Sequence, residues 1–208
     1  RSTLFPYTTL FRSLSLHGCT SRALEEMKIE FEKNGIEVIS FWVGKDPIPD
    51  SLVNDKESPK GKQKIDEFMK LAEECDGFVF GGPVYFSNPS GQLMSFMNRV
   101  FYGSKPELFA GKVGVGITTA RRAGVVSTMD DINHYFYLKQ MIIPTAFYWN
   151  QVYGAVAKDV EQDKEGLQNL RRLAQNMTYI LKLIELGKKN GIEFPSFDEK
   201  KERTNFIR

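Results

Sequence analysis

The stretch GFVFGGPVYFSNPSGQL, residues 77–93, combines the two features on which the interpretation of the fold depends. Its first part, Gly77 to Gly82, is a short apolar run between glycines, which is typical of a strand buried on both faces of a parallel sheet. In its second part, Gly82 and Pro83 allow the backbone to approach a ligand closely, and Tyr85 and Phe86 add aromatic surface. A plain Pro/Gly turn followed by two core aromatics explains the same residues equally well.

Strand and helix signals alternate regularly on both sides of this stretch. Strands are expected at 36–44, 77–82, 112–119 and 142–149, and helices at about 20–34, 65–72, 93–100, 128–140 and 160–189. Thr20 or Ser21 is the expected cap of the first helix. Such alternation implies right-handed crossovers and a parallel sheet that helices cover on both faces. The sequence therefore predicts an α/β, flavodoxin-like three-layer sandwich whose five-stranded parallel sheet has the order 2-1-3-4-5, with one more strand needed in front of the first helix.

Composition excludes several classes of protein. The chain has 208 residues, 41% hydrophobic and 26% charged, so it suits one globular α/β domain and is not expected to be disordered. The formal charge of +2 comes from Arg1 and Arg12, so neither nucleic acid nor a membrane is an expected partner. No apolar run approaches the ~20 residues that cross a bilayer, and no signal peptide is recognised, so a cytoplasmic location is expected. The two cysteines, Cys19 and Cys75, suit a reducing compartment.

The first thirteen residues, RSTLFPYTTLFRS, stand apart from the rest of the chain. They resemble the translation of a widely used DNA-sequencing adapter, and we interpret residues 1–13 as a non-native scar. The alternative is a genuine short strand, which Tyr7 and Leu10 would tolerate. The scar interpretation predicts a flavodoxin-like domain at 14–190, a tail at 191–208, and the loss of the native first strand.

Ligands of open parallel sheets bind beyond the carboxyl ends of the strands, where the strand order reverses. This rule selects three loops, 13–21, 83–91 and 119–128. The first loop leads into a helix N-terminus, where backbone N–H groups and hydroxyls suit a phosphate. Cys19, at the same helix end, is expected to have a lowered thiol pKa.

A family resemblance rests on several of these segments. GGPVYFSNPSGQLMSFMNRVFY resembles the corresponding segment of flavodoxin-like NAD(P)H-dependent FMN reductases, whose relatives include iron–sulfur flavoproteins. Further similar segments are LFAGKVGVGITTARRAG, FYWNQVYG, DKEGLQNLRRLAQNM and RTNFIR, so the resemblance runs from about residue 18 to the end. Relatives often carry a cysteine cluster in the region of 49–63, and this chain has none there, which excludes an iron–sulfur cluster.

The resemblance implies which residues hold FMN and which cofactor reduces it. The ring contacts would be Pro83, Val84, Tyr85, Phe86, Ser87 and Asn88 on one loop and Thr119, Ala120, Arg121 and Gly124 on another. The phosphate contacts would be Ser13, Ser15, Cys19, Thr20 and Ser21. Where the family has two threonines, this chain has Val125 and Val126, and the family's first glycine is Arg12. The resemblance implies NAD(P)H as co-substrate, and no catalytic side chain or metal ligand is assigned.

Three functions stay open at this stage. The first is an enzyme that passes hydride from NAD(P)H through FMN to a small-molecule electron acceptor: a quinone, a free flavin, a nitroaromatic or an oxidised metal. The second is a flavodoxin-type electron carrier, and the third is a non-catalytic FMN-binding module. Arg121 and Arg122 favour the enzyme because a cation near the flavin stabilises its reduced anion, although both are equally compatible with a solvated surface pair. The tail and the aromatic stretch 135–137 suggest a homodimer or homotetramer.

Overall fold

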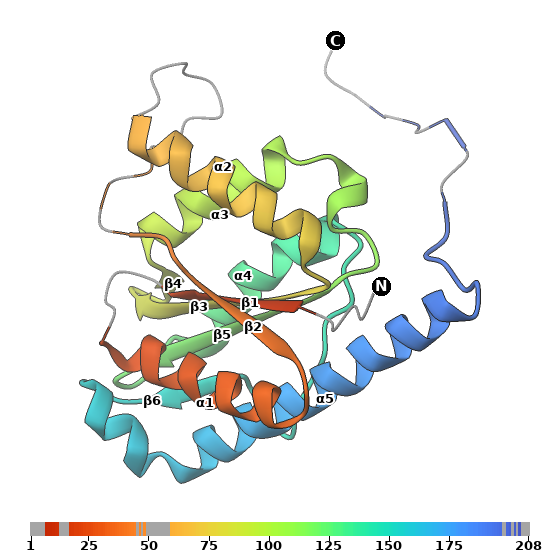
Figure 1. Cartoon of the computed structure of the whole chain (residues 1–208). Helices are drawn as coiled ribbons and strands as arrows, with labels where there is room; N and C mark the ends of the chain where they lie inside the picture. Colours follow the sequence, from red (N-terminus) through yellow and green to blue (C-terminus); the bar gives the residue numbers. More distant parts are fainter. Residues whose placement is uncertain are drawn as a thin grey trace.

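The computed structural model describes residues 7–12, 17–44, 46, 48, 59–196, 199, 200, 202 and 204 (Figure 1). Its main sheet follows the strand order β2-β1-β3-β5-β6, and all of these pairs are parallel. The strands are β1 (Tyr7–Arg12), β2 (Glu37–Trp42), β3 (Gly77–Tyr85), β5 (Val113–Ala120) and β6 (Gln151–Tyr153). Read along the chain, this is the predicted order. One addition is the two-residue strand β4 (Asn88–Pro89), which folds back antiparallel on the end of β3.

Helices cover both faces of the sheet (Figure 1). One face packs against α1 (Cys19–Lys33) and α5 (Lys164–Lys189). The other packs against α2 (Pro59–Glu74), α3 (Gly91–Gly103) and α4 (Val125–Leu138). Two 3₁₀ helices, η1 (Pro106–Leu108) and η2 (Ala157–Gln162), complete the described elements. Within the described residues, no helix combines the length and the apolar character that crossing a bilayer requires.

β3 shows how the apolar run builds two cores at once. Successive side chains of a strand point to opposite faces. Val79 therefore packs with the aliphatic residues of α1 and α5, whereas Phe78 and Phe80 pack into a cluster of phenylalanines under α2, α3 and α4. In that cluster the rings of Phe68 and Phe78 meet edge to face, with centroids 6.1 Å apart. Each of these side chains is fully buried, so β3 is the buried central strand that its sequence predicts.

The structure forms the first strand from residues of the segment interpreted as a scar. Residues 7–12 form β1, which pairs with β2 on one side and β3 on the other. Thr9, for example, lies opposite both Ile39 and Phe78. The sequence Tyr-Thr-Thr-Leu-Phe is rich in residues that favour strands, so it can fill this position whatever its origin. Residues 7–12 thus occupy the position of the first strand, and both the loss of the native strand and the non-native origin of residues 1–13 stay predictions.

The strand expected at 142–149 is also wrong. Ile142 makes only an isolated bridge to Val113, and the regular ladder begins later, at β6. Pro144 has no N–H to give to a ladder. The side chain of Asn169, on α5, takes the place of a strand partner: its Oδ1 accepts from Tyr148 N at 2.9 Å, and its Nδ2 donates to Trp149 O at 2.8 Å. A long-range side chain therefore overrides the local apolar pattern.

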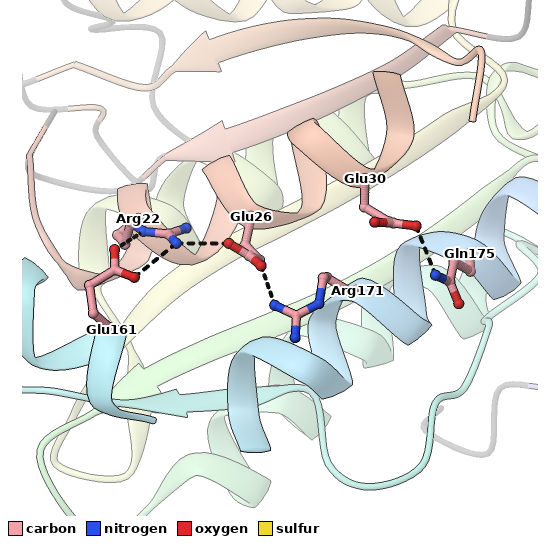
Figure 2. A network of polar contacts seen from close by, with 6 residues as sticks. All are labelled: Arg22, Glu26, Glu30, Glu161, Arg171 and Gln175. Atoms are coloured by element: carbon pink, nitrogen blue, oxygen red, sulfur yellow. Dashed lines mark hydrogen bonds and ion pairs between the residues drawn. The ribbon is translucent and has the colours of Figure 1, made fainter. Parts of the chain in front are cut away.

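A network of ion pairs and hydrogen bonds joins α1 to α5 and η2 (Figure 2). Glu26 accepts from Arg22 at 2.8 Å and also from Arg171, while Arg22 donates to Glu161. Burial raises the pKa of Glu26, but the hydrogen bonds from the two arginines outweigh it and hold that pKa below its usual value. One turn further along, Gln175 donates to Glu30 at 2.8 Å. The network fixes how α1 lies along α5.

The pairing of β1 with both β2 and β3 can be tested by substitution. Replacing Thr9 by proline removes one ladder N–H in the middle of the sheet, so we expect the free energy of unfolding to fall by about 1–3 kcal/mol. Thr9→Val, which keeps the N–H and the β-branched shape, is the matched control and should unfold close to the parent chain. Urea unfolding followed by circular dichroism measures both. Equal stability of the two variants would show that β1 is not a central strand.

Candidate functional site

A cavity of about 360 Å³ lies beyond the carboxyl ends of β3, β5 and β6, next to the N-terminus of α1. It brings together one stretch from each of the three loops that the strand-order rule selects, and a fourth stretch that the rule did not select. Its lining consists of Gly18, Cys19, Thr20, Pro83, Val84, Tyr85, Thr119, Ala120, Arg121, Gly154 and Ala155. The sequence therefore predicted where the cavity lies and most of its walls.

The N-terminus of α1 forms one end of the cavity without a side-chain cap. Gly18 is the N-cap residue, and the helix begins at Cys19, so the expected capping by Thr20 or Ser21 is wrong. Instead, the hydroxyl of Thr20 forms a buried 2.8 Å hydrogen bond with the hydroxyl of Thr119 at the end of β5. The first N–H groups of a helix have no partner within it, and they carry the positive end of its dipole. This end of the cavity is therefore suited to an anion.

Cys19 links the first loop to the fourth. Its thiol donates to the carbonyl oxygen of Gly154 at 3.3 Å. Burial raises the pKa of the thiol, the negative charge of Asp159 adds to the rise, and together they outweigh the opposing backbone hydrogen bond. The expected lowering of this pKa by the helix N-terminus is therefore wrong. Cys19 is a neutral wall residue near pH 7 rather than a thiolate.

The loop after β3 divides into a wall and a tip. Pro83, Val84 and Tyr85, the last residues of β3, line the cavity. Phe86 and Ser87 instead form the turn of a hairpin between β3 and β4, and both have positive φ, 51° and 60°. Two successive left-handed residues are the signature of a type I′ turn, the tight hairpin turn that matches strand twist. These two residues and Asn88, which follows them, do not line the cavity in this structure.

The side chains at this tip are exposed, which contradicts one interpretation of the loop. The side chain of Phe86 is fully exposed, and Tyr85 is 49% exposed. The interpretation of the loop as a plain turn with two core aromatics is therefore wrong. Asn88 steadies the tip by donating from Nδ2 to the carbonyl oxygen of Phe86 at 2.7 Å.

The hairpin tip docks on the N-terminus of α4. Ser127 Oγ donates to the carbonyl oxygen of Ser87 at 2.9 Å. Gly124, the N-cap of α4, has φ 92°, and a Cβ atom at this position would lie 2.7 Å from Ser87 Oγ and 2.9 Å from Val84 Cγ1. Gly124 was predicted as a ligand contact, but it does not line the cavity. Its role in the structure is to let the hairpin and α4 approach each other.

The loop after β5 supplies the cation of the site. Arg121 lines the cavity, and both Arg121 and its neighbour Arg122 are exposed. Thr119 and Ala120, which precede them on β5, are buried. Val125, which stands at the position of a family threonine, is buried as the first residue of α4, so the substitution suits an apolar environment. The cavity thus has an arginine, Arg121, among its residues on the β5 side and a helix N-terminus on the α1 side.

Sequence reasoning missed the fourth wall, Gly154 and Ala155. Their signal was the segment FYWNQVYG, whose last residue is Gly154. The wall continues β6, because Gly154 N donates to the carbonyl oxygen of Ala120 at 3.0 Å. Of the remaining predicted contacts, Ser21 is buried in α1 and does not line the cavity, and Ser13 and Ser15 lie outside the described residues.

The described part of the chain contains no group of three His, Cys, Asp or Glu side chains that could hold a metal ion. Residues 49–58, which belong to the segment predicted to lack a cysteine cluster, lie outside the described ranges. The sequence itself limits the chain to Cys19 and Cys75, fewer than the four thiolates of a typical iron–sulfur cluster.

Comparison with solved structures shows the fold. A crystal structure of RosB with a bound flavin intermediate, 8-demethyl-8-formylriboflavin-5'-phosphate, superimposes with a TM-score of 0.69 at 13% identity, over 98% of this chain and 92% of that chain. A flavodoxin from the domain Archaea superimposes with a TM-score of 0.60 at 13% identity, over 86% of this chain and 99% of that chain. The α/β flavodoxin-like fold predicted from the sequence is confirmed.

Sequence comparison shows the family. An iron-sulfur flavoprotein of Methanocaldococcus jannaschii is 33% identical over 132 residues, which are 58% of this chain and 66% of that protein. The match thus spans just under two thirds of that relative. A second iron-sulfur flavoprotein of the same organism is 29% identical over 185 residues, 80% of this chain and 90% of that protein. The sequence pattern of one family matches residues 9–154, from within β1 to the fourth wall of the cavity, and the chain belongs to that family, the NADPH-dependent FMN reductases.

Proposed function

We propose that this protein holds FMN in the 360 Å³ cavity and uses it to pass hydride from NAD(P)H to a small-molecule electron acceptor. The observation that carries the proposal is the convergence on one cavity of the uncapped N-terminus of α1, the ends of β3 and β5, and Arg121. Membership of the FMN reductase family supports it and makes the protein a flavin-binding oxidoreductase.

The walls suit the two chemically different halves of FMN. A phosphate dianion fits the N-terminus of α1, where Gly18 leaves the backbone open and the helix dipole is positive. A flat ring fits the opposite walls, where the strand ends present backbone groups at Pro83 and Ala120 and the half-exposed ring of Tyr85. The fit is thus one of charge at one end and of flat, partly apolar surface at the other.

The residues of this chain bind and orient rather than transfer protons. Bound FMN supplies the two-electron chemistry, which needs no acid or base from the protein. Arg121 places a positive charge at the cavity edge, where it stabilises negative charge that develops on the ligand. Tyr85, exposed beside the cavity, offers a stacking surface that favours planar acceptors such as quinones, flavins or nitroaromatics over a metal ion.

The visible spectrum of the protein mixed with FMN tests the proposal first. We expect a perturbed flavin spectrum on mixing, because the ring leaves water for the cavity, and bleaching on anaerobic addition of NADPH or NADH. Free FMN with the same nucleotide and no protein is the control. A perturbed spectrum that neither nucleotide bleaches would contradict the enzyme and leave the electron carrier or the binding module. An unperturbed spectrum would remove FMN from the cavity.

Gly124→Ala tests the wall formed by the β3–β4 hairpin. A side chain at φ 92° is strained and collides with Ser87 and Val84, so we expect a loss of about 1–3 kcal/mol of stability and weaker FMN binding as the hairpin shifts. Gly103→Ala, at the end of α3, is the matched control, because a Cβ atom there meets nothing within 4 Å. Fluorescence quenching of FMN and urea unfolding measure both effects. Equal FMN affinity in the two variants would show that the hairpin does not shape the site.

We also propose that the protein is a homodimer or homotetramer. The two tyrosines of the aromatic stretch 135–137 lie in different environments. The Tyr135 ring packs on Phe101, with centroids 5.5 Å apart, whereas the side chain of Tyr137 is 61% exposed. Tyr137 and its exposed neighbour Leu138 therefore remain for a second copy. Light scattering at micromolar concentration is expected to give at least twice the monomer mass, and a monomer mass would overturn the prediction.

A further inference from the structure

The fourth wall of the cavity is a short loop, Gly154 to Val156, whose backbone N–H groups are all engaged within the protein. Gly154 N donates to the carbonyl oxygen of Ala120 at 3.0 Å. The N–H groups of Ala155 and Val156 both donate to Oδ2 of Asp159, each at 3.0 Å. A loop with no free N–H group cannot bind an anion through its backbone.

Asp159 fixes the position of this loop through hydrogen bonds. Its carboxylate accepts two hydrogen bonds from the loop, and its own backbone N–H donates to the carbonyl oxygen of Val156 at 2.9 Å. On the cavity side, the carbonyl oxygen of Gly154 accepts the thiol hydrogen of Cys19. The loop is therefore held between η2, which carries Asp159, and α1, which carries Cys19. Hydrogen bonds to a charged group are stronger than neutral ones, so the Asp159 side contributes most to the hold.

The charge of Asp159 acts on the cavity wall as well as on the loop. It is one of the causes, after burial, of the raised pKa of the Cys19 thiol. A negative charge at this place disfavours a second negative charge nearby. The loop thus adds no backbone donor for a phosphate at the N-terminus of α1, and the charge of Asp159 opposes negative charge there.

We propose that Asp159 is a positioning residue of the FMN site: it shapes the loop 154–156 into the fourth wall and withholds that loop's N–H groups from the phosphate. The N–H groups at the start of α1, next to this loop, are thereby left as the backbone donors for the phosphate. This inference rests on the proposed function for its ligand, but the hold of Asp159 on the loop can be measured without any ligand.

Two substitutions of Asp159 distinguish the effect of its hydrogen bonds on FMN binding from the effect of its charge. Both loop N–H groups donate to the same oxygen, so Asp159→Asn can keep both bonds through its amide oxygen while it removes the charge. Asp159→Ala removes bonds and charge together. We expect Asp159→Ala to weaken FMN binding by about tenfold or more, and Asp159→Asn to bind at least as tightly as the parent. Glu161→Gln, which removes a charge from the same 3₁₀ helix without a bond to the loop, should leave FMN affinity unchanged.

The rate at which iodoacetamide alkylates Cys19 is a second measurement, and it is made without FMN. Cys75 is 1% exposed, so the reaction in the native protein reports Cys19. We expect Asp159→Asn to react faster than the parent, because the thiol loses a repelling charge, and Asp159→Ala to react faster still, because the loop no longer holds Gly154 against the thiol. Asp159→Glu keeps the charge but misplaces the oxygen, and serves if Asp159→Ala fails to fold: it should weaken FMN binding.

The outcomes are distinct. Equal FMN affinity of Asp159→Ala and the parent would overturn the proposal, as would equal weakening by Asp159→Ala and Asp159→Asn, which would assign the effect to charge alone. Equal alkylation rates in all variants would show that Asp159 does not hold the loop, whatever the result with FMN. A parent chain that fails to bind FMN, with alkylation rates in the expected order, would reject the proposed function while confirming the hold on the loop.

Discussion

The pairing of β1 with two neighbours at once is the constraint on which the rest of the structure depends. β1 lies between β2 and β3, so the strand order reverses beside it, and the first turn of α1 follows from it toward the carboxyl edge of the sheet. Without β1, β2 would lose its partner in the main sheet and α1 would lose the strand that leads into it. Fold and cavity therefore share one requirement, a strand-forming segment ahead of residue 17, and the sequence of that segment matters less than its ability to pair on both edges.

The elements predicted correctly from the sequence are those whose signal is local. The glycine-bounded apolar run of β3 and the helical spacing of α3 and α5 belong to short stretches of chain, and they appear where the periodicity placed them. The strand expected at 142–149 was wrong because its partner is the side chain of Asn169, more than a dozen residues away, and no periodicity reveals such a substitute. The cap expected at Thr20 was wrong for the same reason, since its hydroxyl forms a hydrogen bond with Thr119 at the end of β5, far away in the sequence.

The same distinction between local signals and long-range contacts applies to the residues of the cavity. Strand order and loop position were enough to locate three walls, because the carboxyl ends of neighbouring parallel strands meet at one edge. The roles of individual residues within a loop needed coordinates. Phe86 and Gly124 were predicted as FMN contacts, which stays a prediction; the structure places Phe86 at a hairpin tip and Gly124 where that tip approaches α4. The fourth wall was missed because its donors are fixed by Asp159, and a carboxylate that binds backbone amides has no sequence signature beyond its spacing.

The hairpin tip has a consequence for how such a protein diversifies. Its residues lie beside the cavity but outside its lining, and they are held through backbone atoms of Ser87 and the start of α4 rather than through the side chain of Phe86. The side chain at position 86 can therefore be exchanged with little effect on packing within the chain. A substitution at position 86 therefore changes the surface beside the cavity while the residues that line the cavity stay the same.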